Sequence, residues 1–267
     1  MADLALRRRL NPLRRLNVLG LATGALLIGL WELAVVTGLL DFDYLPKPSQ
    51  IAVGLQDITV TGELQENLVH TLTASLTGWA LAAVAGVAVG VVLGLVRPVW
   101  QYSMASIEAL RALPIVAFVP VAVLLLGFTL TMEIVVAFYA ALWPILLNTQ
   151  AGVRSVDRRL LEVGDIMGFG RAERLWKLVL PASTSYIVVG LRLGLSISLV
   201  LTLVAEMVGN PAGLGYALIQ KGQTLNPDQM FAYVIVIGLC GIVLNTILLL
   251  AARFTFKGQM LAAGDVG

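Results

Sequence analysis

The sequence predicts an all-α integral membrane protein with about six transmembrane helices, and three observations support this fold class. Hydrophobic residues make up 58% of the 267 residues and charged residues only 13%, with a mean hydropathy of +0.90. About a quarter of the residues in a soluble domain are charged, so this chain lacks the charge to cover a water-facing surface. Six apolar stretches are long enough to cross a bilayer, and the basic residues gather in alternate connections between them.

The first apolar stretch, residues 17–40, is expected to be a transmembrane anchor helix that stays on the chain. It is too long for a signal peptide, and no small-residue cleavage site follows it. Residues 41–68 then form a periplasmic segment. In this segment the prolines of residues 45–49 enforce a turn, and a short interfacial helix follows.

Residues 69–252 are expected to form the core domain, in which five further helices cross the membrane. Lipid offers the backbone no hydrogen-bond partners, so each apolar stretch must satisfy its own backbone groups as a helix. The five predicted spans cover residues 69–96, 105–127, 131–150, 183–207 and 230–252.

The basic residues predict how these spans are oriented. Residues 1–16 contain five arginines, the loop 151–182 contains six basic residues, and the tail 253–267 contains two. Basic residues concentrate on the cytoplasmic side, so both tails and this loop are predicted to lie in the cytoplasm.

The formal net charge of +2 argues against a nucleic-acid partner. With one cysteine and one histidine, no disulfide framework and no metal site are expected.

The cytoplasmic loop 151–182 is the most informative connection because it is long and strongly charged. The pattern predicts a short helix over residues 157–167 that is stopped by Gly168 and Gly170, and then a second piece that stops before Pro181. Two such pieces would form a compact knob outside the membrane. An ordinary amphipathic loop that follows the distribution of basic residues is the alternative.

The same loop resembles the signature of ABC-importer permeases, which reads Glu-Ala-Ala, three residues, Gly, nine residues, Ile-x-Leu-Pro. Here Glu162 takes the acidic position, Gly168 the glycine position, and residues 178–181 read Leu-Val-Leu-Pro after the same spacing. The chain departs from the signature with Val163 and Gly164 in place of the two alanines, and with leucine in place of isoleucine. Other segments, among them residues 70–76 (His-Thr-Leu-Thr-Ala-Ser-Leu) and 205–207 (Ala-Glu-Met), are similar to the nitrate/sulfonate/taurine-type branch of this family.

The resemblance implies a type I ABC importer permease fold in the bacterial cytoplasmic (inner) membrane. It implies a transport subunit, not an enzyme, that conducts a small, anionic solute such as nitrate, a sulfonate or taurine. The implied partners are two ABC ATPase subunits, a second permease copy in a homodimer, an extracytoplasmic solute-binding protein, and membrane lipid. The chain contains no Gly-Lys dipeptide and so no phosphate-binding loop; ATP and Mg are expected in the ATPase chain, and no cofactor in this one.

By the same resemblance, the loop would dock on the ATPase as a coupling element and pass on its motion. The residues assigned to this coupling loop are Glu162, Val163, Gly164, Asp165, Met167, Gly168, Phe169, Gly170, Leu180 and Pro181.

Charged residues inside spans are costly and mark a pathway or an ion pair. Glu108 and Arg111 could pair on one helix face, either as a structural pair or as part of a gate. Arg192 is expected to line an internal pathway or to pair with a neighbouring helix, whereas Glu206 and His70 are expected to be interfacial. The full set assigned to the pathway or gate is Glu108, Arg111, Pro114, Arg192, Ser196 and Glu206.

Glycines at every fourth position of the second span, Gly86, Gly90 and Gly94, are expected to let another helix pack closely.

The sequence leaves three alternative functions open. An intramembrane serine hydrolase would need His70 as the base for Ser196, although these are predicted at different depths. A secondary transporter that works without ATP would leave the loop unexplained, and a permease of the same family could carry a neutral, aromatic or pyrimidine-type compound.

Overall fold

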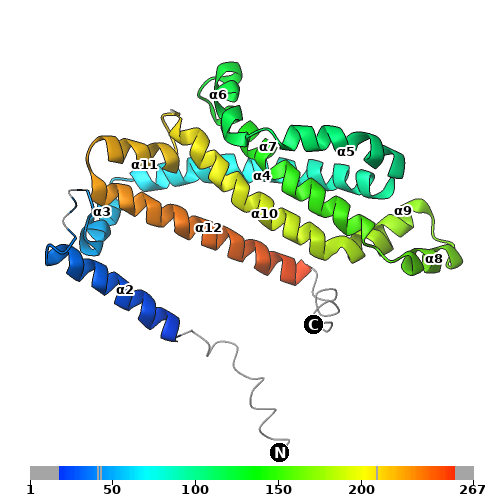
Figure 1. The fold of residues 1–267 in the computed structure, drawn as a ribbon, viewed down its shortest axis with the longest axis horizontal. Helices are drawn as coiled ribbons and strands as arrows, with labels where there is room; N and C mark the ends of the chain where they lie inside the picture. The colour runs from blue at the N-terminus through cyan, green and yellow to red at the C-terminus, as the bar shows by residue number, and fades with distance from the viewer. Residues whose placement is uncertain (1–17, 41, 43, 209, 256–267) are drawn as a thin grey trace, which may run out of the picture.

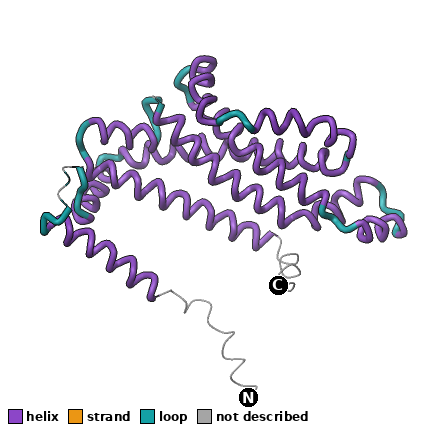
Figure 2. Tube along the Cα trace, viewed as in Figure 1, coloured by secondary structure: helices purple, strands orange, loops and turns teal. Residues whose placement is uncertain are grey.

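The computed structural model describes residues 18–40, 42, 44–208 and 210–255, and every regular element in these ranges is a helix (Figures 1 and 2). The predicted basic tail 1–16 and residues 256–267 of the predicted C-terminal tail lie outside the described residues. The helices are α2 (Val18–Val36), α3 (Pro48–Val60), α4 (Glu63–Leu95), α5 (Arg97–Arg111), α6 (Ile115–Leu126), α7 (Leu130–Arg154), α8 (Arg158–Ile166), α9 (Arg171–Arg174), the π-helix η2 (Leu175–Val179), α10 (Leu180–Met207), α11 (Leu214–Gln223) and α12 (Pro227–Thr255).

Within the described ranges, four helices are long and apolar enough to cross a membrane: α4, α7, the continuous helix Arg171–Met207, and Pro227–Ala252 of α12. The bent pair α5 and α6 counts as a fifth span if the two are taken together. The shorter apolar helix Ala22–Val36, which is most of α2, lies at the first predicted span. The all-helical membrane fold predicted from the sequence is therefore confirmed.

The predicted third span, residues 105–127, is wrong as a single straight helix. The structure breaks it between α5 and α6, whose axes meet at 82°. Proline cannot occupy a helix interior without loss of a hydrogen bond, and it also disfavours the α conformation of the residue before it. Pro114 therefore lies outside both helices in an extended conformation, at the N-cap of α6.

The predicted stop before Pro181 is also wrong. The chain continues from α9 through η2 into α10 as one helix, Arg171–Met207. Pro181 lies in the first turn of α10, and the amide of Leu180 just before it donates to the carbonyl oxygen of Leu175 in π-helical spacing. The wider turn accommodates the proline at the junction.

The centre of the molecule is formed by α4, α7 and α10, which make the most extensive helix contacts. Glycines allow this close approach: a Cβ atom at Gly86 would lie 2.9 Å from Cγ2 of Ile145, and one at Gly194 would lie 2.7 Å from Cδ1 of the same isoleucine. Thus both α4 and α10 are packed against α7 through positions without a side chain.

The two ends of the molecule carry different small helices (Figure 1). α8 and α9 lie at one end of the long axis, and α3 and α11 lie at the opposite end. The predicted interfacial helix is α3, which ends at Val60, so that α4 starts earlier than the predicted second span. The carboxylate of Glu32 on α2 accepts hydrogen bonds from the amide and hydroxyl of Ser49, at 3.0 and 2.8 Å, in the first turn of α3.

Candidate functional site

The predicted knob in the loop 151–182 is formed by α8, α9 and η2. The carboxylate of Asp157 accepts a hydrogen bond from the amide of Arg159 at 2.9 Å and caps the start of α8, as its position in the sequence predicts. α8 ends where Gly168 adopts a φ of +71°, a conformation that glycine reaches without strain. The amide of Phe169 then donates to the carbonyl oxygen of Gly164 at 2.9 Å and closes the turn.

The knob is fixed internally by packing and ion pairs. Gly164 is buried, and a Cβ there would lie 2.7 Å from Cδ1 of Leu178, so glycine lets the two segments touch. Asp165 pairs with Arg174 across the turn, and Lys177 lies 4.8 Å from the ring centre of Phe169. These contacts join α8 to the helix that continues into α10.

Apolar side chains at the outer surface of the knob face solvent. Ile166 is 87% exposed, Met167 62% and Trp176 70%, and Val163 is also exposed. Glu162, the acidic residue of the predicted signature, is exposed as well and forms a 3.4 Å ion pair with Arg158. A small, rigid knob with exposed apolar residues is suited to insert into a complementary groove of another protein.

Arg192 and Ser196, two residues predicted for the pathway, lie in a groove of about 600 Å³ between α10 and α12. Nε of Arg192 donates to Oδ1 of Asn245 on α12 at 2.7 Å, and its two terminal nitrogens make no hydrogen bond to the described residues. The groove is otherwise lined by apolar side chains such as Leu193 and Ile242. The groove thus contains one guanidinium that is held in place by a hydrogen bond.

The other predicted pathway residues lie apart from this groove. Glu108 and Arg111 form a 3.4 Å ion pair at the end of α5, and each side chain is about half exposed. They border a separate groove of about 610 Å³ that also touches Trp143 on α7 and Ile197 on α10. Pro114 marks the bend beyond this pair, so three of the predicted residues gather at the junction of α5 and α6.

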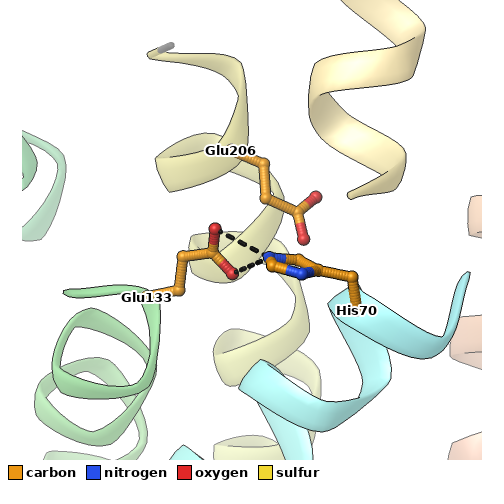
Figure 3. Close-up of side chains that lie close together, drawn as sticks. All are labelled: His70, Glu133 and Glu206. Atoms are coloured by element: carbon orange, nitrogen blue, oxygen red, sulfur yellow. Dashed lines mark hydrogen bonds and ion pairs between the residues drawn. The ribbon is translucent and has the colours of Figure 1, made fainter. Parts of the chain in front are cut away.

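Glu206 and His70 were both expected to be interfacial. Glu206 lies one residue before the end of α10, as expected, but its side chain is fully buried between helices (Figure 3). His70 on α4, Glu133 on α7 and Glu206 on α10 point toward one another, and each offers a ligand atom within 4.8 Å of the others. Nε2 of His70 lies 2.9 and 3.1 Å from the two carboxylate oxygens of Glu133. We refer to these three residues as the buried triad.

A surrounding layer of hydrogen bonds holds the carboxylates of the buried triad. One oxygen of Glu206 accepts from the hydroxyl of Thr71 at 2.6 Å, and the other accepts from the amide of Gly215 at 2.7 Å. Glu133 also accepts from the side-chain amide of Asn210. The amide of Gly213 donates to the side chain of Asn67 at 2.9 Å, so Gly213 is tied to α4 and Asn210 to α7.

Glu133 and Asn210 were not among the site residues predicted from the sequence. Glu133 is an acidic residue inside the predicted span 131–150, and the rule that singled out Glu206 applies to it equally. Asn210 gives no such signal, because a polar residue in a connection between helices is ordinary. His70, Glu133 and Glu206 come together because of the way α4, α7 and α10 are rotated and aligned against one another. Hydropathy along the sequence gives no information about this alignment.

Comparisons with known proteins agree on one family. Residues 64–257 match the family model described as "Binding-protein-dependent transport system inner membrane component". The putative aliphatic sulfonates transport permease protein SsuC of Bacillus subtilis is 29% identical over 89% of this chain and 86% of its own length. The taurine transport system permease protein TauC of Escherichia coli is 31% identical over 88% and 87%. A structure of the MetNI methionine ABC transporter in an inward-facing conformation has a TM-score of 0.61 and 20% identity, over 73% of this chain and 94% of that one.

Proposed function

Because the chain belongs to the family of binding-protein-dependent transport system inner membrane components, we propose that it forms the transmembrane pathway of an ATP-driven importer for a small anionic solute. The chain is a permease subunit of the inner membrane. ATP hydrolysis takes place in a partner chain, and a binding protein delivers the solute. ATP and Mg are bound by the ATPase, and two ATPase chains serve a homodimer of this chain within the lipid bilayer.

The exposed apolar surface of the knob supports the docking of the ATPase at α8. Ile166, Met167 and Trp176 are largely exposed, and exposed apolar groups on a rigid element favour a protein partner. The ion pair of Asp165 with Arg174 and the turn at Gly168 keep the knob rigid enough to transmit force. Because η2 joins the knob to α10 without a break, motion of the knob reaches the membrane directly.

The anionic substrate class rests on the relatives and on Arg192. Two relatives are named for sulfonates and taurine, and the groove between α10 and α12 presents one guanidinium among apolar residues. A guanidinium binds sulfonate or carboxylate oxygens through two parallel hydrogen bonds. Asn245 holds Nε, so the two terminal nitrogens of Arg192 are left for a ligand.

Reconstitution tests this function directly. The chain is inserted into lipid vesicles with its ATPase and binding protein, and uptake of taurine, an alkanesulfonate and nitrate is measured with and without ATP. We expect ATP-dependent uptake of at least one of these anions, and no uptake when the ATPase is omitted. Uptake that proceeds without the ATPase would contradict the proposed ATP-driven import. The anionic substrate class would be contradicted if none of the three anions is taken up while a neutral or pyrimidine-type compound, added in a parallel assay, is transported.

Glu162→Ala in the same vesicles tests the role of the knob. The side chain of Glu162 is exposed and forms its ion pair with Arg158 of the same helix, so the bundle should assemble normally without it. We expect ATP hydrolysis to continue while uptake falls. Unchanged uptake by this variant would count against docking at the predicted signature.

A further inference from the structure

The buried triad of His70, Glu133 and Glu206 brings two carboxylates and one imidazole together in the interior of the helix bundle. The side chains of Glu133 and Glu206 are 0% exposed, and the imidazole of His70 supplies at most one positive charge. A buried charge without a partner is strongly unfavourable. The side chains of Thr71 and Asn210 donate hydrogen bonds to these carboxylates but carry no charge.

We propose that the buried triad is a binding site for a first-row divalent transition metal ion, with Zn²⁺ and Mn²⁺ as the best-matched ions. The three ligand atoms, one imidazole nitrogen and two carboxylate oxygens, converge within 4.8 Å from three different helices. A mixed nitrogen and oxygen donor set suits these ions, whereas Mg²⁺ prefers oxygen ligands and retained water. This inference departs from the expectation of no metal, which was based on there being a single histidine.

The groups around the triad have the properties of a second layer in a metal site. Metal-binding carboxylates are held in place by hydrogen bonds from neighbouring donors. Glu206 is held by the hydroxyl of Thr71 and the amide of Gly215, and Glu133 by Asn210. The hydroxyl of Thr71 also accepts from the amide of Leu214 at 2.9 Å, so the donors themselves are fixed.

A route for an ion leads to the triad from the surface. His70 is 23% exposed and lies in the wall of a cavity of about 530 Å³. The same cavity is lined by two carboxylates, Glu63 and Glu66, and by the amide side chain of Asn67. Glu63 is paired with Lys221 at 2.9 Å, whereas Glu66 makes no ion pair within the described part of the chain. The carboxylate of Glu66 is therefore the group at the entrance that can attract a cation.

A bound ion would join elements that transport is expected to separate or rotate. α4, α7 and α10 each contribute a ligand, and the segment from Asn210 to Gly215 closes over them. The triad lies at the end opposite the knob, where the continuous helix Arg171–Met207 ends. The ion would therefore stabilise one arrangement of this end. The inference does not depend on the proposed substrate.

Metal binding by the full-length chain tests the inference. The protein is purified in detergent with an affinity tag that lacks histidine, stripped with a chelator, and titrated with Zn²⁺, Mn²⁺ and Mg²⁺. Calorimetry gives the affinity, and the melting temperature gives a second readout that does not depend on transport. We expect one Zn²⁺ or Mn²⁺ ion per chain, a higher melting temperature with that ion, and weaker binding of Mg²⁺.

Variants decide whether the triad holds the ion. His70→Ala and Glu133→Gln should each weaken binding by at least about tenfold. Gln220→Ala, a neutral position in the same cavity wall but outside the triad, should bind the ion as the wild type does. His70 is partly exposed, so its alanine variant keeps the test valid if Glu133→Gln does not fold. The inference is overturned if the wild type neither binds nor is stabilised by Zn²⁺ or Mn²⁺, or if both variants retain full affinity. If the wild-type chain binds the metal but its reconstituted complex does not transport, the proposed function is contradicted and the metal site is not.

Discussion

A single methyl group is enough to disturb the contact between α4 and α7. A Cβ atom at Gly90 would lie 2.7 Å from the carbonyl oxygen of Leu146 and equally close to Cβ of Thr149, and one at Gly94 would lie 2.5 Å from Cβ of Val153. Both distances are well inside van der Waals contact. Because backbone and β-branched side chains cannot move aside easily, the whole of α4 would have to shift.

Gly90→Ala is therefore expected to destabilise the folded chain by about 1–3 kcal/mol. Gly238→Ala on α12 is the matched control, since a Cβ there meets no atom within 4 Å. The measurement is thermal unfolding of the two purified variants in the same detergent. Equal melting temperatures for both variants would show that the close contact between α4 and α7 is not needed.

Arg192 is the residue on which the substrate class depends most. Arg192→Ala removes the guanidinium from the groove between α10 and α12, so we expect weaker anion transport, seen as a higher KM for uptake. Glu32→Ala is the comparison, because Glu32 only holds Ser49 at the start of α3. A larger loss of uptake in the Glu32 variant than in the Arg192 variant would show that Arg192 does not bind the solute.

At the scale of elements, the turn that ends α8 requires glycine at position 168 but not at position 170. Gly168 has a φ of +71°, whereas Gly170 has a φ of −66°, and a Cβ at either position would meet no neighbouring atom. Space is therefore equal at the two positions and the backbone conformation differs. A non-glycine residue in the left-handed region costs roughly 1–2 kcal/mol.

Gly168→Ala should accordingly distort the knob, and Gly170→Ala should not. We expect ATP-dependent uptake to fall in the first variant and to match the wild type in the second, with the two proteins equally abundant in the membrane. Uptake measured in the same reconstituted vesicles makes the comparison. If Gly168→Ala transports normally, the shape of the turn has no part in coupling.

The elements also indicate which parts of the fold can be predicted from the sequence. Apolar length located the spans, and Asp157 with Gly168 located both ends of α8, because caps and positive φ angles are local properties. Hydropathy did not reveal the 82° bend at Pro114, since both halves of the broken span are apolar enough. Nor did it reveal that helix continues through Pro181, where a π-helical turn accommodates the proline.

The knob could be predicted from the sequence, whereas the buried triad could not. The knob lies within one connection, so its residues could be named from one stretch of sequence. The buried triad draws one residue from each of three spans, and the rotation of each helix decides whether its side chain points inward. Even so, a charged residue within an apolar span is a signal, and it applied to Glu133 as well as to Glu206.

Considered as a whole, the molecule has two specialised ends connected by one helix. The helix Arg171–Met207 begins in the knob and ends at Glu206 of the buried triad. At 1.5 Å per residue its 37 residues span about 55 Å. If this helix moves as a rigid body, a displacement of the knob by a partner also displaces the opposite end of the helix.

Photo-cross-linking from α8 tests most directly the claim that the knob receives the ATPase. Cys240 is first replaced by serine, and a benzophenone group is attached to a new cysteine at Ile166 or, as the control, at Leu124 on α6. These two side chains are 87% and 86% exposed, so neither label is covered by the chain itself. In the assembled importer we predict a cross-link to the ATPase from position 166 and none from position 124. A label at 166 that remains unlinked, while the ATPase is captured at 124, would contradict the account.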